Sequence, residues 1–211
     1  MKSLKLFAAI IATSFAVASC NSNEEKVENT EVEEGISGTF TADVNASKVL
    51  WTGEMVKILD LVGVKSHNGE INLESGSIVL ENEQITGGEF VVDMKSIVPL
   101  DSNYGETEHT REELVGHLAT NDFFLADSFP TASFVITGAD STGVMGDLTI
   151  RGNTNSEKIT NVVVTKTDNG IEVSGDLSFD RQKYEVTFSS GSKDVVLKDE
   201  IDLTFKVVAQ P

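Results

Sequence analysis

The chain has 211 residues, of which 34 are acidic and 16 are basic, so its formal net charge is −18 at neutral pH. This charge argues against nucleic-acid binding, where a basic patch supplies most of the affinity. It also argues against adsorption to an anionic bilayer through charge alone.

The first 19 residues predict a lipoprotein signal peptide. Lys2 and Lys5 precede an apolar run, residues 6–17, that is too short for a comfortable transmembrane span. The run ends in Val17-Ala18-Ser19-Cys20, which resembles the bacterial lipobox, and Cys20 is the only cysteine. We expect Cys20 to be lipidated, for example with palmitate, and to hold the protein at a membrane of the bacterial cell envelope. The protein would then face the periplasm or the cell surface, and stable anchoring takes more than one acyl chain.

Residues 20–38 predict an acidic, flexible tether. Positions 21–38 contain six glutamates, one lysine and no aromatic residue, a composition that buries too little apolar surface to fold. Without residues 1–19 the chain keeps 14 basic and 34 acidic residues, a net charge of −20. The remaining residues, 39–211, are enough for one domain with a sizeable core.

Apolar residues alternate with polar ones through most of this domain, which is typical of strands with one buried face. The alternating segments are 48–55, 69–80, 86–97, 133–138, 143–152, 161–166, 170–181 and 200–210. They predict eight to ten strands separated by Gly, Asn, Asp and Ser turns. An all-β fold follows, in which antiparallel strands close into a barrel or stack as a sandwich.

One helix is predicted in the middle of the chain, over residues 111–119. Thr110 and Glu113 match a capping box, in which each side chain binds the backbone N–H of the other. Leu114, Val115 and Leu118 then follow at helical spacing.

Four phenylalanines, Phe123, Phe124, Phe129 and Phe134, come directly after this helix. Aromatic clusters usually belong to a filled core. Phenylalanine lacks a polar group, however, so it also suits the wall of a dry apolar cavity. The sequence leaves both interpretations open.

The three histidines, His67, His109 and His117, show no spacing typical of a metal site. A Gly-x-Ser-x-Gly nucleophile motif is also missing from the sequence. We therefore predict no metal, no cofactor and no catalytic residue. A triad whose members lie far apart in sequence stays open.

Several short motifs follow one another in order through residues 39–209. They are Trp51-Thr52-Gly53, His67-Asn68-Gly69, 87–94 (GGEFVVDM), His117-Leu118, Asp122-Phe123-Phe124, 129–134 (FPTASF), 146–152 (GDLTIRG) and Phe179-Asp180-Arg181. This series resembles the YceI-like family, lipocalin-like proteins associated with the binding of polyisoprenoids and other long-chain lipids. The resemblance implies an eight-stranded antiparallel β-barrel with a short helix inserted mid-chain. It further implies an envelope lipid-binding or carrier protein, not an enzyme.

The resemblance and the alternating faces together give a predicted ligand site. Its cavity lining is Trp51, Phe90, Met94, Leu118, Phe123, Phe124, Phe129, Phe134, Leu148, Ile150, Leu177 and Phe179. Candidate contacts for a polar head group are His67, Arg151 and Arg181, although carboxylates of this acidic chain compete for both arginines.

Three hypotheses remain. The favoured one is a lipid-anchored carrier whose partner is an isoprenoid, a fatty-acyl amphiphile or a quinone tail. The second is an envelope hydrolase or isomerase that uses His67 or His117, and it predicts a histidine beside a carboxylate in a cleft. The third is an interaction module with a filled barrel. The sequence decides neither the ligand nor whether the protein forms a homodimer.

Overall fold

The described chain consists mostly of strands. The computed structural model describes residues 35–57, 64–107, 109–191 and 195–211. The strands are β1 (Gly38–Ala42), β2 (Lys48–Lys57), β3 (Val64–Ile71), β4 (Leu73–Glu81), β5 (Gln84–Asp93), β6 (Val98–Pro99), β7 (Thr131–Asp140), β8 (Gly143–Ile150), β9 (Asn153–Thr167), β10 (Gly170–Asp180) and β11 (Val195–Gln210). The helices are η1 (Met94–Ser96), α1 (Arg111–Leu118) and η2 (Arg181–Tyr184). The predicted signal peptide, Cys20 and nearly all of the predicted tether lie outside the described residues.

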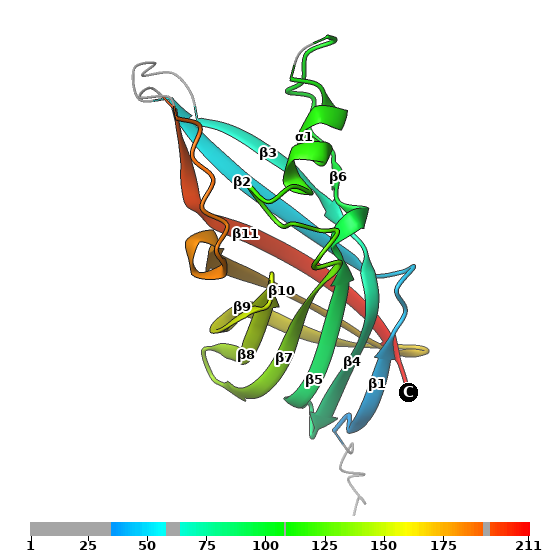
Figure 1. Cartoon of the computed structure of the whole chain (residues 1–211). Coiled ribbons are helices and arrows are strands. Elements are labelled where there is room, and N and C mark those ends of the chain that lie inside the picture. The colour runs from blue at the N-terminus through cyan, green and yellow to red at the C-terminus, as the bar shows by residue number, and fades with distance from the viewer. Residues whose placement is uncertain (1–34, 58–63, 108, 192–194) are drawn as a thin grey trace, which may run out of the picture. The chain divides into compact units, whose positions relative to one another are not determined.

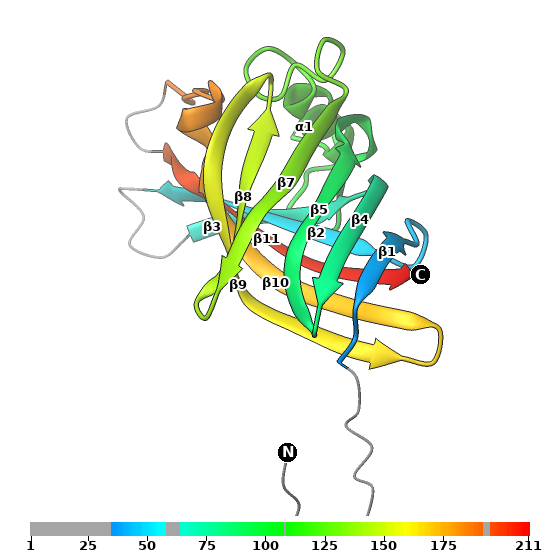
Figure 2. The same cartoon turned by 90° about the horizontal axis from the view of Figure 1, so that it is seen from below.

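The strands form one antiparallel sheet that closes on itself. Their order is β1-β4-β5-β7-β8-β9-β10-β11-β2-β3-β6, and β1 also pairs with β11. Along β11, β2 pairs with residues up to Lys206 and β1 continues at Ala209, so β1 and β2 behave as one interrupted strand. The pair β3 and β4 does the same across Asn72. Counted in this way, the ring is the predicted eight-stranded antiparallel barrel, which is confirmed (Figure 1, Figure 2).

The barrel splits where β3 gives way to β4. Leu73 of β4 pairs with Val92 of β5, but β3 pairs with the short strand β6 instead, through Gly69 opposite Pro99. The backbone of Asn72 holds this junction, because its carbonyl accepts from Asp93 N at 3.0 Å and its N–H donates to Ser96 Oγ at 2.8 Å. Asp93 also caps η1 by accepting from Lys95 N. The chain therefore leaves the sheet at Asp93, and β3 extends beyond β5.

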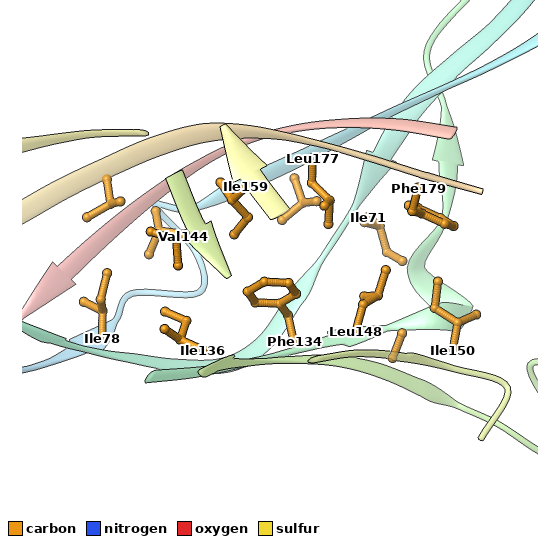
Figure 3. Packing of buried hydrophobic residues seen from close by; sticks show 14 of the residues in the cluster. Ile71, Ile78, Phe134, Ile136, Val144, Leu148, Ile150, Ile159, Leu177 and Phe179 are labelled. Atoms are coloured by element: carbon orange, nitrogen blue, oxygen red, sulfur yellow. The ribbon is translucent and has the colours of Figure 1, made fainter. Parts of the chain in front are cut away.

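The inner face of the barrel is apolar on strand after strand. In β8, Val144, Gly146, Leu148 and Ile150 are buried and alternate with half-buried residues. Figure 3 shows Ile159, Leu177 and Phe179 facing Phe134 and Leu148 across the interior. The period-two pattern of the sequence therefore corresponds to the inner and outer faces of the barrel.

Helix α1 lies at the end of the barrel where β5 ends and β7 begins (Figure 1). The predicted capping box is present: Thr110 Oγ1 accepts from Glu113 N at 3.2 Å, and Thr110 N donates to Glu113 Oε2 at 3.0 Å. The helix spans Arg111–Leu118, one residue shorter than predicted. Among the described residues, no helix has the length and apolar character needed to cross a membrane.

The close approach of β7 and β8 generates a stability prediction. A β-carbon at Gly146 would stand 2.7 Å from the carbonyl oxygen of Val135 and still closer to the ring of Phe134. Gly146→Ala should therefore lower the free energy of unfolding by about 1–3 kcal/mol, the usual cost of overpacking a core, measured by urea denaturation. Gly138→Ala is the matched control, because its added methyl meets no atom within 4 Å. Equal stabilities of the two variants would contradict this account of the interior.

Candidate ligand-binding cavity

The barrel encloses an apolar cavity of about 240 Å³. Its walls come from the inner faces of the strands, from α1, and from residues 119–130, the segment between α1 and β7 that we call the cover segment. The lining residues are Val49, Trp51, Gly53, His67, Ile71, Leu73, Phe90, Val92, Met94, Ile97, Leu114, Leu118, Phe123, Phe124, Ala132, Ser133, Phe134, Leu148, Ile150, Ile159, Leu177, Phe179, Arg181, Val186, Leu197, Ile201, Leu203, Phe205 and Val207.

The structure brings most of the predicted lining residues together. Those found in the cavity wall are Trp51, Phe90, Met94, Leu118, Phe123, Phe124, Phe134, Leu148, Ile150, Leu177 and Phe179. Their contact with a ligand stays a prediction. The sequence prediction omitted the inner face of β11 and several wall residues of other elements, among them Val49 of β2, Ile71 of β3 and Ile159 of β9. The alternation of Ile201, Leu203, Phe205 and Val207 was the signal that would have added β11.

Phe129 does not line the cavity. Its backbone N–H donates to Leu125 O at 3.0 Å, which turns the cover segment back before β7. Its ring lies against Gly152, where a β-carbon would stand 3.2 Å from Cε1. Gly152 has a φ of 77°, so glycine satisfies both the turn and the space that Phe129 occupies. The sequence predicts Phe129 in the wall because it lies close to Phe123 and Phe124 in the chain, but closeness in sequence does not determine which way a side chain of an irregular segment faces.

A polar cluster stands at the edge of the cavity around Asp101. His67 Nδ1 lies 3.2 Å from Asp101 Oδ1, and the Tyr104 hydroxyl donates to Oδ2 at 2.8 Å. The rings of His67 and Tyr104 stack with centroids 5.1 Å apart. The backbone amides of Asn68 and Asn103 also donate to this carboxylate. Its side chain is only 6% exposed, so Asp101 fixes the loop after β6 and the orientation of the His67 ring.

His117, on helix α1, holds the cover segment. His117 Nε2 lies 3.0 Å from Asp122 Oδ2. The ring also meets Phe123 and Phe188 edge-on, with centroid distances of 5.0 and 4.7 Å. This packing fixes the ring of Phe123 at the cavity wall. His109 is exposed.

The described residues contain no group of three or more His, Cys, Asp or Glu side chains that could hold a metal ion.

Comparison with known proteins shows the family of this chain. A model of the YceI-like domain matches residues 40–209. The chain belongs to the YceI-like family.

Individual proteins match this YceI-like chain at low sequence identity or over only part of its length. A UPF0312 protein of Staphylococcus aureus (strain USA300) is 35% identical over 79 residues, which make up 35% of this chain. The match spans 46% of the length of that curated relative. Among solved structures, BcnA of Burkholderia cenocepacia has a TM-score of 0.58 at 20% identity, covering 79% of this chain and 98% of BcnA. A polyisoprenoid binding domain from Saccharophagus degradans has a TM-score of 0.55 at 13% identity, covering 81% and 97%. Both show the same fold.

The two arginines predicted as head-group contacts bind protein carbonyl groups of this YceI-like barrel instead. Arg151 is absent from the cavity wall, and its Nη1 donates to the carbonyls of Phe123 and Glu185, each at 2.7 Å. Arg181 does reach the wall, but its guanidinium donates to three carbonyls, including Val186 O at 2.6 Å, and to Asp199 Oδ1 at 2.9 Å. The structure therefore places Arg151 outside the predicted head-group site and leaves Arg181 already paired. Sequence could not show these carbonyl partners, because loop backbone carries no sequence signal.

The electrostatics of the Asp101 cluster follow from its hydrogen bonds. Burial alone would raise the pKa of Asp101. Hydrogen bonds from the backbone of Asn103, the Tyr104 hydroxyl, the backbone of Asn68 and the His67 ring outweigh burial and hold that pKa below its usual value of 3.8. Burial and the neighbouring carboxylate both raise the pKa of Tyr104. The carboxylate is therefore ionised and the phenol protonated at neutral pH.

This cluster predicts a pH-dependent contribution to stability. A carboxylate whose pKa is depressed by folding stabilises the protein above its unfolded pKa, and that stabilisation is lost as the pH falls through the folded pKa. Asp101→Asn should lower the free energy of unfolding at neutral pH by about 1–3 kcal/mol, because an amide cannot accept every one of these hydrogen bonds. The gap between variant and wild type should narrow as the pH drops below 3.8. Denaturation at several pH values measures the difference in free energy of unfolding between the variant and the wild type. A difference that does not change with pH would contradict this role of Asp101.

Proposed function

We propose that this protein binds a long-chain amphiphile, a polyisoprenoid or a fatty-acyl compound, inside the barrel and carries it within the bacterial cell envelope. The observation that carries the proposal is the apolar cavity of about 240 Å³ in the barrel. Ligand pockets of this kind are concave, mostly apolar and supplied with a few polar groups.

The exposure of the inner face favours a hollow barrel over a filled one. Phe90, Phe123, Phe124 and Phe205 pack against the core yet are only partly buried, and all four line the cavity. In a filled interaction module these rings would pack against one another, since interiors are normally packed to crystal-like density. A bound chain would complete their burial.

The energetics of such a ligand are favourable. Burying one CH₂ group is worth ~0.8 kcal/mol, so a five-carbon prenyl unit contributes at most ~4 kcal/mol. Association costs roughly 4–15 kcal/mol in lost freedom. A few prenyl units are therefore enough for binding without any strong polar contact.

One structural neighbour and one sequence prediction further support the proposal. The structural neighbour from Saccharophagus degradans is a polyisoprenoid binding domain. The lipobox at Cys20 would anchor the protein at the envelope membrane, and the acidic segment 20–38 would give the barrel reach from that surface. A carrier that stays near a membrane can exchange lipid with it.

The second candidate function is an envelope hydrolase or isomerase, and one observation favours it. His67 lies beside Asp101 at the edge of the cavity, as a general base would. The backbone and tyrosine hydrogen bonds of Asp101, however, already account for its position. The two functions differ in what happens to the ligand. A carrier releases its ligand chemically unchanged, whereas an enzyme converts it to a product.

Occupying the cavity with protein tests the proposal. Ala132 is buried in β7 and lines the cavity, so Ala132→Phe should weaken binding of a long-chain prenol at least about tenfold, as expected when the buried space is lost. Val135→Phe is the matched control, because Val135 lies on the same strand, is 41% exposed and is not in the wall. Native mass spectrometry of the purified chains, followed by lipid extraction, measures occupancy and ligand mass.

Three outcomes of this experiment are distinct. Loss of the lipid in Ala132→Phe alone supports the carrier. A wild-type chain that takes up no prenol, quinone or fatty acid would mean that the barrel acts as a filled module. Turnover of the lipid to a product of different mass, abolished by His67→Asn, would establish the enzyme instead.

A further inference from the structure

Trp51 carries a polar group without a partner in the cavity wall. Its indole Nε1 is buried and has no hydrogen-bond acceptor within the part of the chain that the structure describes. Nearly all buried N–H groups in proteins are paired, so an unpaired one calls for an explanation. The ring lies over Gly69, where a β-carbon would stand 2.7 Å from Cε2. Because Gly69 has no side chain, the Trp51 ring can occupy this position in the wall.

His67 offers the complementary group. Its Nδ1 lies 3.2 Å from Asp101 Oδ1, and an ionised carboxylate only accepts hydrogen bonds, so this network assigns the proton to Nδ1. In the neutral imidazole Nε2 is then an acceptor. His67 lines the cavity and its side chain is 27% exposed. No hydrogen bond from Nε2 to another described residue is present.

The register of β2 and β3 places these two residues on the same face of neighbouring strands. Trp51 pairs with Gly69, and Gly53 pairs with His67, so the two polar side chains are diagonal neighbours on the inner face. Diagonal neighbours lie roughly 7–8 Å apart, within reach of long and aromatic side chains. Each is paired with a glycine, Trp51 with Gly69 and His67 with Gly53, so neither has a side chain directly opposite it in the register.

Charge around this part of the cavity disfavours an anion. Arg181 is the one lysine or arginine among the described lining residues, and its guanidinium is 4% exposed and paired with Asp199 at 2.9 Å. Behind His67 stands the carboxylate of Asp101. A phosphate or carboxylate placed here would meet this negative charge, and the described lining residues offer no unpaired lysine or arginine to balance it. Arg111 lies outside the wall, where it donates to Asp101 O and lies over the Tyr104 ring.

We propose that Trp51 and His67 form a head-group subsite for a neutral hydroxyl, an alcohol or a phenol, at the end of the bound chain. The hydroxyl oxygen accepts from Trp51 Nε1–H, and its hydrogen is donated to His67 Nε2. This inference rests on the proposed function, because it needs an apolar chain held in the barrel. It restricts the ligand to amphiphiles with an uncharged head and selects against prenyl phosphates and fatty acids.

Four ligands that share one isoprenoid chain test the subsite: geranylgeraniol, its methyl ether, its monophosphate and the parent hydrocarbon. Their affinities for the full chain are measured by displacement of diphenylhexatriene, a fluorescent apolar probe. The alcohol should bind about tenfold tighter than the hydrocarbon and the monophosphate, and the ether should fall between, because each neutral hydrogen bond is worth about 3- to 10-fold.

Two variants assign the two hydrogen bonds. Trp51→Phe keeps a ring but removes the N–H, so it should weaken the alcohol and the ether about 3- to 10-fold and leave the hydrocarbon unchanged. His67→Asn keeps a donor for Asp101 but removes Nε2, so it should weaken the alcohol alone. His109→Asn is the matched control: His109 is exposed, and its φ of 57° suits asparagine.

The other outcomes distinguish failure of the head-group subsite from failure of the proposed carrier function. Equal affinities for all four ligands, or tightest binding of the monophosphate, would overturn the subsite and leave the carrier function standing. Equal losses of affinity for the alcohol and the hydrocarbon in Trp51→Phe would mean that the ring contributes only by packing and that its N–H forms no hydrogen bond with the ligand. Failure of every ligand to displace the probe would overturn the proposed function together with the subsite. If either variant does not fold, judged by circular dichroism, the ligand series on the wild-type chain still decides.

Discussion

The departure of β5 from the sheet at Asp93 is the constraint on which the cavity depends. The interior of an eight-stranded barrel is just wide enough to be filled by side chains or to hold one small ligand, so small changes at its ends decide which occurs. Here Asp93 caps η1 instead of continuing the strand, and β3 pairs onward with β6. Ile71 and Leu73, on either side of the junction, and Met94 and Ile97, just beyond β5, all line the cavity. The split therefore contributes apolar side chains from both of its sides to the wall of the cavity.

The cover segment lies over the apolar space of the cavity, and its backbone needs hydrogen-bond partners there. An irregular segment over an apolar space has backbone carbonyls that must find donors, since unpaired buried polar groups are costly. Arg151 supplies donors to the carbonyls of Asn121, Phe123 and Glu185 from a single Nη1. His117 braces the ring of Phe123 against Phe188. Polar side chains thus act behind the cover segment, while its phenylalanines Phe123 and Phe124 face the cavity.

Sequence reasoning recovers what is local and periodic. The capping box of Thr110 and Glu113 is a contact between residues three positions apart, and the alternation of Val144, Leu148 and Ile150 follows from strand geometry. Phe129 and Arg151 depend on tertiary contacts, with Gly152 and with loop carbonyls, that no spacing encodes. Alternation also reports only which face is buried, so a hollow barrel and a filled one produce the same pattern. The distinction became visible only when the strands were placed in space.

The placement of polar groups shows how one wall can be both apolar and selective. Most polar side chains near the cavity are fully employed by the protein: Arg181 by carbonyls and Asp199, Asp101 by backbone amides, Tyr104 and His67. Such saturation stabilises the loops and withdraws these charges from a ligand. Among the described polar groups of the wall that have no hydrogen-bond partner are the indole N–H of Trp51 and the far nitrogen of the His67 imidazole, on adjacent strands and opposite two glycines. In a wall this apolar, the unpaired donor is costly until a ligand oxygen meets it, and that cost is the physical basis on which the barrel would discriminate between ligands of equal chain length.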